Sequence, residues 1–483
     1  METIIESINS YVWSSALIAL CAITGIYFSV RLGFLQFTNI KEMLRLLFGG
    51  KKTAKGITPF QAFSLAISGR VGTGNIVGVA TAIAMGGPGA IFWMWFIALM
   101  GSASAFIEST LSQVYKQEIN NEYRGGPAYY IEKGLGIKWY AILFSVVTII
   151  SCGLLLPGVQ SNSIASSMHN AFNINTIDIN GLPVNYIGFG IVILLALIIF
   201  GGIQRLGQAS EFIVPFMAGA YILMAIIIIG INISQIPHVL KLILSSAFGI
   251  EPLYSGVFGM AIAWGIKRGI YSNEAGQGTA PHAAAAAEVS HPAQQGLVQA
   301  FSVYIDTIFV CTATAFMILF TGQYNVQNEA GEYIVENLPG TNYTGFTQAA
   351  VSSVFPSFGD GFVAIALFFF AFTTIMAYYY YAETNITYIF RHKNTKLYIW
   401  ILRVFFLIAT YYGTVKSAET AWAIGDIGVG LMAWVNIIAI LLLGNVAIKV
   451  WNDYKKKKKE GILNPTFNSK ELGIKNADFW ENK

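Results

Sequence analysis

Long apolar stretches separated by short polar segments follow one another along most of the chain. A helix needs about 20 apolar residues to cross the hydrocarbon core of a bilayer, and by that measure we predict about eleven membrane-spanning helices. The predicted spans cover approximately residues 11–30, 60–85, 90–114, 139–160, 186–202, 213–231, 256–287, 297–321, 362–390, 397–412 and 421–450.

Residues 34–48, which follow the first span, have a different pattern. Apolar side chains recur there with the period of a helix, from Phe34 to Leu47, and the basic residues Lys41 and Arg45 lie between them. This pattern predicts an amphipathic helix that lies in the membrane interface.

The composition supports an all-α, polytopic membrane protein. Hydrophobic residues make up 55% of the chain and charged residues only 11%, whereas soluble domains contain about 25% charged residues. Cys21, Cys152 and Cys311 all lie in apolar stretches, which is typical of small buried side chains rather than of disulfides or a metal site. We therefore expect membrane lipids around the protein and no nucleic-acid partner.

Positively charged residues are concentrated in alternate loops, which predicts the orientation of the chain. They are Arg31, Lys41, Arg45, Lys51, Lys52, Lys55, Lys116, Arg124, Lys133, Lys138, Arg205, Arg391, Lys393, Lys396 and the run Lys455–Lys459. The loops at residues 170–183 and 322–359 contain no lysine or arginine. Because loops rich in these residues stay in the cytoplasm, we expect a multi-pass protein of the bacterial plasma membrane, with its N-terminus outside and its C-terminus in the cytoplasm.

The second predicted span contains an interruption, SGRVGTGNIVGV, from Ser68 to Val79. Glycine weakens a helix by roughly 1 kcal/mol relative to alanine, and an arginine such as Arg70 near the bilayer centre costs at least about 2.5 kcal/mol. Non-helical backbone at membrane depth is tolerated where it is buried in protein or lines a cavity. The interruption therefore predicts one half of a transport site, although a single glycine-rich break is as often a simple kink.

A second interruption follows in the seventh predicted span. Its apolar halves are residues 255–264 and 279–287, and between them lie Lys267, Arg268, Asn273, Glu274 and Gln277 with four glycines. Two glycine-interrupted spans at corresponding positions of two halves are typical of an alternating-access transporter. Each half has five spans, so the two repeats are expected to be inverted. We expect four segments: residues 1–58 (first span and interfacial helix), 59–232 (first repeat), 233–452 (second repeat) and 453–483 (basic tail).

Three motifs of the chain resemble those of the alanine or glycine:cation symporters. They are GGPGAIFWMWFIALMG at residues 86–101, GTGNIVGV at 72–79 and GIYSNEAGQG at 269–278. The resemblance implies the inverted five-plus-five-helix fold of the bacterial leucine transporter, with one extra N-terminal helix. It also implies sodium- or proton-coupled uptake of a small neutral amino acid such as alanine or glycine, without a cofactor. Some similar proteins take glutamine.

The first interruption offers groups that suit the carboxylate of an amino acid. The N-terminus of a half-helix has free backbone N–H groups and the positive end of the helix dipole. The resemblance to the leucine transporter assigns the carboxylate to Thr73 and Gly74, and the Asn75 side chain could bind the substrate or an ion. For the ammonium we expect unwound carbonyls between Trp264 and Ile270, including that of Gly269.

Three further side chains are candidates for the substrate pocket. Asn273 offers a side-chain acceptor for the ammonium, Trp264 could form a wall of the pocket, and Gln160 follows Pro157 and Gly158 in the fourth span. Tryptophan is equally common against lipid or in a core, and Gln160 could instead mark an external helix end.

Sodium prefers hard oxygen ligands, and Thr373 and Thr374 are adjacent hydroxyls in the ninth span. By resemblance to the leucine transporter fold, they join the carbonyls of Ser68 and Val71 around a sodium ion. The alternative for each threonine is a hydrogen bond to the carbonyl four residues earlier in its own helix.

Intramembrane carboxylates are functional candidates by default. Glu108, Glu274, Asp306 and Asp426 all lie within predicted spans, and Asp306 is our candidate for the coupling ion or proton. Structural ion pairs with Arg70, Lys267 or Arg268 are the alternative.

Two other classes of membrane protein fit the sequence less well. The five histidines show no metal-binding spacing, and no catalytic arrangement is recognisable at motif level, which disfavours a membrane enzyme. A passive channel would need a filter repeated around an axis or rings of charge, whereas two different broken helices in one chain suit a carrier.

Overall fold

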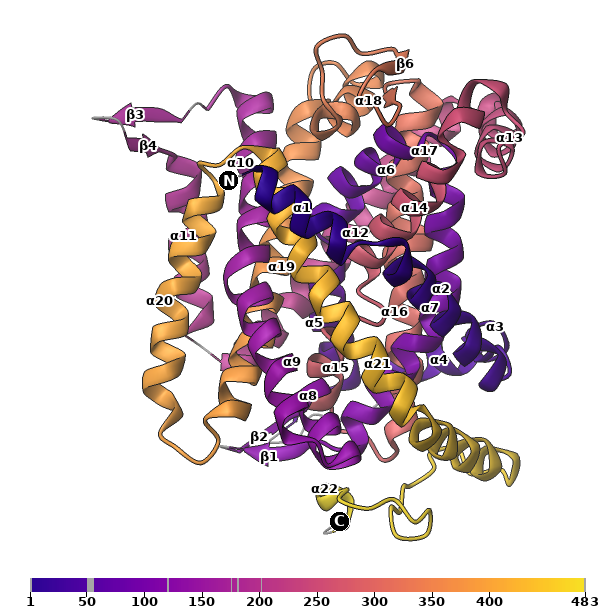
Figure 1. Cartoon of the computed structure of the whole chain (residues 1–483), viewed down its shortest axis with the longest axis vertical. Coiled ribbons are helices and arrows are strands. Elements are labelled where there is room, and N and C mark those ends of the chain that lie inside the picture. The colour runs from indigo at the N-terminus through magenta and orange to yellow at the C-terminus, as the bar shows by residue number, and fades with distance from the viewer. Residues whose placement is uncertain are drawn as a thin grey trace.

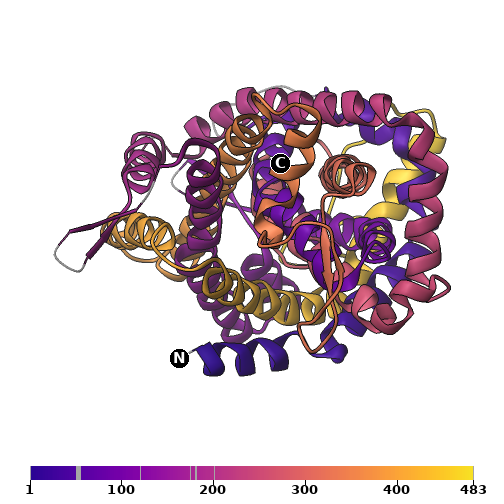
Figure 2. The ribbon, with the colours of Figure 1, turned by 90° about the horizontal axis from the view of Figure 1, so that it is seen from above.

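The computed structural model describes residues 2–49, 56–119, 121–174, 176–179, 182–200 and 202–481. Its helices run mostly along the long axis of the molecule, and the short β3–β4 hairpin projects from one side (Figures 1 and 2). The α-helices are α1 Glu2–Val12, α2 Ser15–Arg31, α3 Leu35–Thr38, α4 Ile40–Leu47, α5 Pro59–Arg70, α6 Val79–Gly86, α7 Ala90–Val114, α8 Pro127–Tyr130, α9 Lys138–Ile150, α10 Leu156–Phe172, α11 Tyr186–Ile199, α12 Gly202–Ile231, α13 Ile236–Ala247, α14 Phe258–Asn273, α15 Ala280–Ala286, α16 Pro292–Val303, α17 Thr312–Thr321, α18 Phe346–Val354, α19 Gly359–Ile389, α20 Thr395–Gly413, α21 Ala418–Lys459 and α22 Asp478–Glu481.

Three antiparallel hairpins and several tighter or wider helical turns complete the described residues. The strands are β1 Gln117–Ile119, β2 Glu122–Arg124, β3 Ile177–Ile179, β4 Leu182–Val184, β5 Asn325–Gln327 and β6 Tyr333–Glu336. Wider π-helical turns are η1 Gly74–Gly78, η2 Ile131–Leu135, η3 Ser151–Leu155 and η6 Tyr304–Cys311, and the 3₁₀ turns are Ile233–Gln235, Pro252–Val257 and Tyr343–Gly345.

Eight helices in the described part of the chain are long and apolar enough to cross a membrane, or nine if the bent pair at residues 233–247 and 252–273 forms one span. The prediction of an all-α polytopic membrane protein is confirmed, but the count of eleven is not. Two more helices are apolar but too short to be counted as spans. Gly74–Gly86 is one half of a broken span, and Tyr186–Ile199 has 14 residues.

The segment predicted as one amphipathic helix forms two, α3 and α4, separated at Asn39. Met43 and Leu47 are buried, whereas Phe37 and Leu44 are exposed. The predicted cytoplasmic lysines at 51, 52 and 55 lie outside the described residues.

Helix α7 lies inside the bundle and packs against α2, α14, α15 and α16. Its second half, GSASAFIESTLSQV, is buried throughout and begins with small residues, which allow helices to approach closely. A Cβ atom on Gly265 would overlap the carbonyl of Ala90, and one on Gly269 would overlap the side chain of Ile97. These two glycines of α14 therefore serve close packing against α7.

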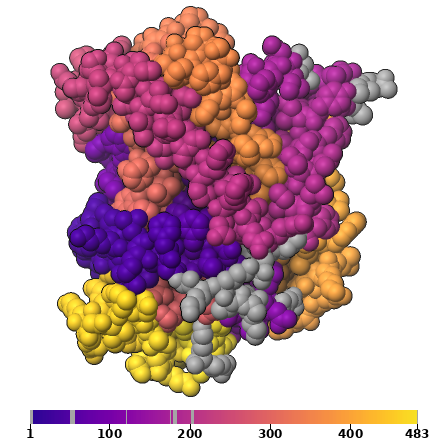
Figure 3. Space-filling view, turned by 180° about the vertical axis from the view of Figure 1, so that it is seen from behind, coloured from indigo at the N-terminus to yellow at the C-terminus, as the bar shows by residue number. Residues whose placement is uncertain are grey.

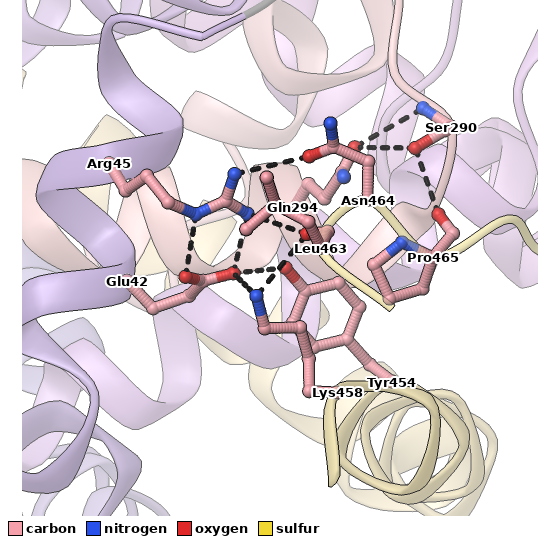
Figure 4. Close-up of polar contacts among 9 residues, drawn as sticks. All are labelled: Glu42, Arg45, Ser290, Gln294, Tyr454, Lys458, Leu463, Asn464 and Pro465. Atoms are coloured by element: carbon pink, nitrogen blue, oxygen red, sulfur yellow. Dashed lines mark hydrogen bonds and ion pairs between the residues drawn. The ribbon is translucent and has the colours of Figure 1, made fainter. Parts of the chain in front are cut away.

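The C-terminal residues form the lower end of the molecule, below the N-terminal helices α3 and α4 (Figure 3). The Arg45 guanidinium donates to the carbonyl of Leu463 at 3.1 Å and forms an ion pair with Glu42 at 2.7 Å. The Glu42 carboxylate also accepts from Tyr454 at 2.6 Å (Figure 4). The hydrogen bonds from Arg45 and Tyr454 hold the pKa of Glu42 at about 2, below its ordinary value.

Candidate functional site

The first interruption is located where the sequence predicts it. Helix α5 begins with a capping box in which the side chains of Thr58 and Gln61 each bond the other's backbone N–H, and it ends at Arg70. Residues 71 and 72 are not helical, a π-helical turn follows from Gly74, and α6 begins at Val79. Every residue from 61 to 84 is buried, so the interruption is closed to solvent.

The second interruption is shorter and later than predicted. Helix α14 continues to Asn273, so the predicted unwound carbonyls from Trp264 to Ile270 are wrong. The Ile270 carbonyl accepts from the Glu274 amide at 3.0 Å and from Gln277 Nε2 at 2.5 Å. The chain leaves the helix only at residues 274–279, where Gly276 has a positive φ of 87° that glycine adopts without strain.

Gly72, Thr73 and Gln160 meet at the first interruption. The Thr73 amide donates to Gln160 Oε1 at 3.1 Å, and the Gly72 amide donates to Asn75 Oδ1 at 2.9 Å. Gln160 is 1% exposed in the middle of a helix, so it does not mark an external helix end. A Cβ atom on Gly72 would overlap the Thr374 hydroxyl and lie 3.0 Å from Gln160 Oε1, which explains why this position has no side chain.

The two adjacent threonines of α19 both bond the Phe370 carbonyl of their own helix, Thr373 at 3.0 Å and Thr374 at 2.9 Å, but differ in their other partners. The Thr374 hydroxyl donates to the Ser68 carbonyl at 2.8 Å and lies 3.4 Å from the Val71 carbonyl. The Thr373 hydroxyl instead bonds the carbonyls of Phe369 and Phe370 in its own helix, at 2.9 and 3.0 Å. The structure thus brings together Ser68, Val71 and Thr374 and leaves Thr373 out of this group.

Asp306 links the two broken helices from the π-helical turn η6. Its Oδ1 accepts from Asn75 Nδ2 at 2.6 Å, and its carboxylate accepts from the Ser272 hydroxyl at 3.0 and 3.1 Å. Thr307 donates a third hydrogen bond at 2.6 Å. Asn273 faces the same region, because its Nδ2 donates to the Thr307 hydroxyl at 3.3 Å. π-helical turns occur frequently at functional sites.

Two hydroxyls beside the first interruption are buried without a hydrogen-bond partner among the described residues. They belong to Thr73 and Tyr271, whose side chains approach each other. Gly74 packs against Tyr271 and Ser272, with a distance of 3.1 Å from its ideal Cβ position to Ser272 Cα. The Tyr271 ring lies 5.0 Å from that of Trp422. Unpartnered buried polar atoms beside aromatic rings suit a small polar ligand with an apolar side chain.

Comparison with known proteins decides the family. The profile of the sodium:alanine symporter family matches residues 1–469. The chain belongs to the sodium:alanine symporter family. YrbD of Bacillus subtilis is 58% identical over 482 residues, which cover 100% of this chain and 98% of that protein. The sodium/proton-dependent alanine carrier protein of Bacillus sp. strain PS3 is 50% identical over 442 residues, which cover 91% of this chain and 97% of that protein.

A solved structure confirms the fold of this symporter-family chain. The crystal structure of MhsT in complex with L-phenylalanine matches it with a TM-score of 0.51 at 13% identity, over 82% of this chain and 100% of that one. The fold is therefore leucine-transporter-like, as the sequence predicts. The chain is a multi-pass membrane transporter and not an enzyme.

In this family member a buried ion-pair cluster joins the interior of α14 to α21, a pairing that the sequence offered only as an alternative. Arg268 and Asp426 form two hydrogen bonds at 2.8 and 3.1 Å, and Lys267 approaches Asp426 at 2.7 Å. Trp264 lies over both cations, with its ring centroid 4.9 Å from Lys267 and 5.1 Å from Arg268. Trp264 thus belongs to this cluster rather than to the group around Thr73.

The lower end of the symporter is closed by backbone and side-chain contacts. Ile57, just before α5, bonds the backbone of Ala286 and Glu288, just after α15, at 3.0 Å each. Gln113 and Lys116, at the end of α7, donate to the Ala287 carbonyl at 3.0 and 2.9 Å. These contacts join the segments beside the two broken helices to each other and to α7 at this end.

Proposed function

We propose that this symporter couples the entry of sodium or protons to the uptake of a small neutral amino acid, alanine or glycine, by alternating access. The observation that carries the proposal is the first broken helix, which is buried and has unpartnered polar atoms beside it. The alanine carrier of strain PS3, similar over almost its whole length, supports the substrate class.

The amino acid would bind between the first interruption and α14. Its carboxylate would accept from the Thr73 amide and hydroxyl and from the Tyr271 hydroxyl, which have the donors that a carboxylate requires. Gln160 Oε1 now accepts from the Thr73 amide at 3.1 Å, so it would turn toward the substrate ammonium when the carboxylate arrives. The rings of Tyr271 and Trp422 would enclose a side chain as small as a methyl group.

A sodium ion would bind among the carbonyls of Ser68 and Val71 and the Thr374 hydroxyl. These three oxygens converge from α5, its C-terminal end and α19, and neutral oxygens are the ligands that hard cations prefer. Asp306 already accepts hydrogen bonds from three side chains, and it would position Asn75 and Ser272. Binding of the coupling ion or proton by Asp306 stays a prediction.

The lower end in Figure 1 would face the cytoplasm of a bacterial cell. The β1–β2 hairpin, α8 and α22 lie at that end (Figure 1). Lys116 directly precedes β1 and Lys133 closely follows α8, which is the position expected of positively charged cytoplasmic residues. A reporter fused after Lys483 should be protected from external reagents in intact cells.

Uptake into proteoliposomes with an imposed sodium or proton gradient tests the proposal. Radiolabelled alanine, glycine and glutamine are compared side by side with the full-length protein. Accumulation of alanine or glycine above its external concentration is expected, and dissipation of the gradient should abolish it. Equilibration without accumulation would indicate a passive channel, and preferential accumulation of glutamine would replace the proposed substrate.

A further inference from the structure

Arg70 is an arginine buried without an ion-paired carboxylate among the described residues. It is the last residue of α5 and is 1% exposed. Its Nη1 donates to the Gln299 carbonyl at 3.0 Å and to the Ser302 hydroxyl, whereas its Nε and Nη2 have no partner among the described residues. The proposed sodium and substrate sites leave this charge without a role.

Glu274 is a buried acidic residue whose hydrogen bonding is also incomplete. It is 1% exposed and directly follows α14, with a positive φ of 54° that is uncommon for a residue with a side chain. Its Oε2 accepts from the Thr279 hydroxyl at 2.8 Å, and its Oε1 has no partner in the described part of the chain. Backbone strain of this kind concentrates at functional sites.

Gly69 and Tyr381 bring these two groups into one place. A Cβ atom on Gly69 would lie 2.5 Å from the Tyr381 hydroxyl and 3.2 Å from Glu274 Oε2. The Tyr381 hydroxyl is also buried without a partner among the residues described, and Arg70 is close enough to act electrostatically on Glu274. Unpartnered groups from α5, the second interruption and α19 therefore face one another.

Other carboxylates lie near Glu274. Glu108 from α7 and Asp306 from η6 both interact with Glu274. Among the described residues, this group therefore contains three carboxylates and the single arginine Arg70. Glu108 accepts from the Gly276 and Gly278 amides and from Asn436, and Asp306 accepts from three side chains. Those two anions are thus stabilised by donors, whereas Glu274 has only one.

Further titratable groups among the described residues that interact with Glu274 are uncharged at neutral pH. They are Tyr271 on α14, Tyr378 and Tyr381 on α19, and Cys152 on η3. A buried charge without compensating partners is strongly destabilising, and a proton on Oε1 would remove it.

We propose that Glu274 is the proton-binding site of the transport cycle and that Arg70 is its partner after the proton leaves. In the closed state Oε1 holds a proton taken from the outside. When the cytoplasmic end opens, the proton passes to water there, and the carboxylate pairs with the free Nε and Nη2 of Arg70. Because Arg70 ends the first half-helix and Glu274 begins the second interruption, the proton controls the separation of the two broken helices.

This inference rests on the proposed function, and it places the proton site apart from the proposed sodium site at Thr374.

The test uses the full-length protein in liposomes that contain a pH-sensitive dye, with equal sodium on both sides and alanine added outside. Wild-type protein is expected to acidify the lumen as alanine enters. Glu274→Gln should exchange alanine but carry at least ~10-fold fewer protons per alanine, and its uptake should lose its pH dependence. Glu332→Gln, in an exposed loop, is the matched control and should behave as wild type.

Each outcome decides between the two proposals. If wild-type protein accumulates alanine in a sodium gradient but carries no protons, or if Glu274→Gln carries as many as wild type, the proton site is wrong and the proposed function stands. If wild-type protein accumulates no amino acid in either gradient, the proposed function itself fails. Should Glu274→Gln not fold, Glu274→Asp decides, because it should carry protons with a shifted pH midpoint, and an unshifted midpoint would overturn the assignment.

Discussion

The pair Thr373 and Thr374 offers a sharp test of the sodium site. Thr374→Val removes the hydroxyl that lies 2.8 Å from the Ser68 carbonyl and 3.4 Å from the Val71 carbonyl, while the bulk of the side chain is kept. The change should weaken sodium binding, because one of the three proposed oxygen ligands is lost and the two carbonyls face a methyl group.

The magnitude follows from the contact that is lost. An interaction between a charged group and a neutral hydrogen-bonding partner contributes about 1.5–3 kcal/mol, and each 1.4 kcal/mol corresponds to about a tenfold change in affinity. The sodium concentration for half-maximal alanine uptake should therefore rise by about 10- to 100-fold. Sodium-dependence curves of uptake into proteoliposomes measure it directly.

Thr373→Val is the control, because its hydroxyl bonds only carbonyls of its own helix and a methionine sulfur. We expect a shift below about twofold, since such local bonds contribute little to helix stability. Equal shifts for both variants, or a larger one for Thr373→Val, would refute the assignment of the sodium ion to Ser68, Val71 and Thr374.

Two further predictions follow from the same structure. Gly72→Ala should lower uptake by at least ~10-fold, because its methyl group would overlap the Thr374 hydroxyl and overpacking costs about 1–3 kcal/mol; Gly190→Ala, where the added atom meets open space, should keep wild-type uptake. Burial lowers the pKa of His291 below 6.5, so its contribution to stability is present above pH 6.5 and is lost as the pH falls. The Tm of the detergent-solubilised protein should therefore drop between pH 7.5 and 5.5, and His291→Gln should reduce that drop; an equal drop in both proteins would contradict the reasoning.

The first interruption could be predicted from the sequence because its causes are local. Glycines and an arginine within an apolar stretch are visible without knowledge of any partner, and the structure leaves the helix at residues 71 and 72, within the predicted range. The meeting of Thr374 with the Ser68 and Val71 carbonyls came from the resemblance, since α5 and α19 are about 300 residues apart. Local sequence alone favoured a hydrogen bond within the helix, and both threonines make that bond, Thr374 in addition to its contacts with α5.

The second interruption shows why glycine content alone misplaces a break. Gly265 and Gly269 lie in regular helix and allow α14 to pack closely against α7, whereas Gly276 and Gly278 have positive φ and form the break. Both uses of glycine look the same in the sequence, because the helix that needs the space is far away in the chain. Ser272 and Tyr271, which the sequence did not single out, reach the site for the same reason: they belong to the turn of helix just before the true break.

Arg70 shows what the sequence reveals about an arginine in an apolar stretch and what it does not. Its charge in an apolar stretch correctly indicates an unusual environment, but its partners Gln299 and Ser302 lie on α16, more than 200 residues away, and no sequence pattern connects them. If Arg70 served only to fix α5 against α16, all of its nitrogens would be expected to have acceptors, because a buried arginine without them is unstable. Two of its three nitrogens have none among the described residues. The incomplete pairing therefore indicates a second conformation in which Arg70 has a partner, and the facing carboxylate whose free oxygen can supply one is Glu274.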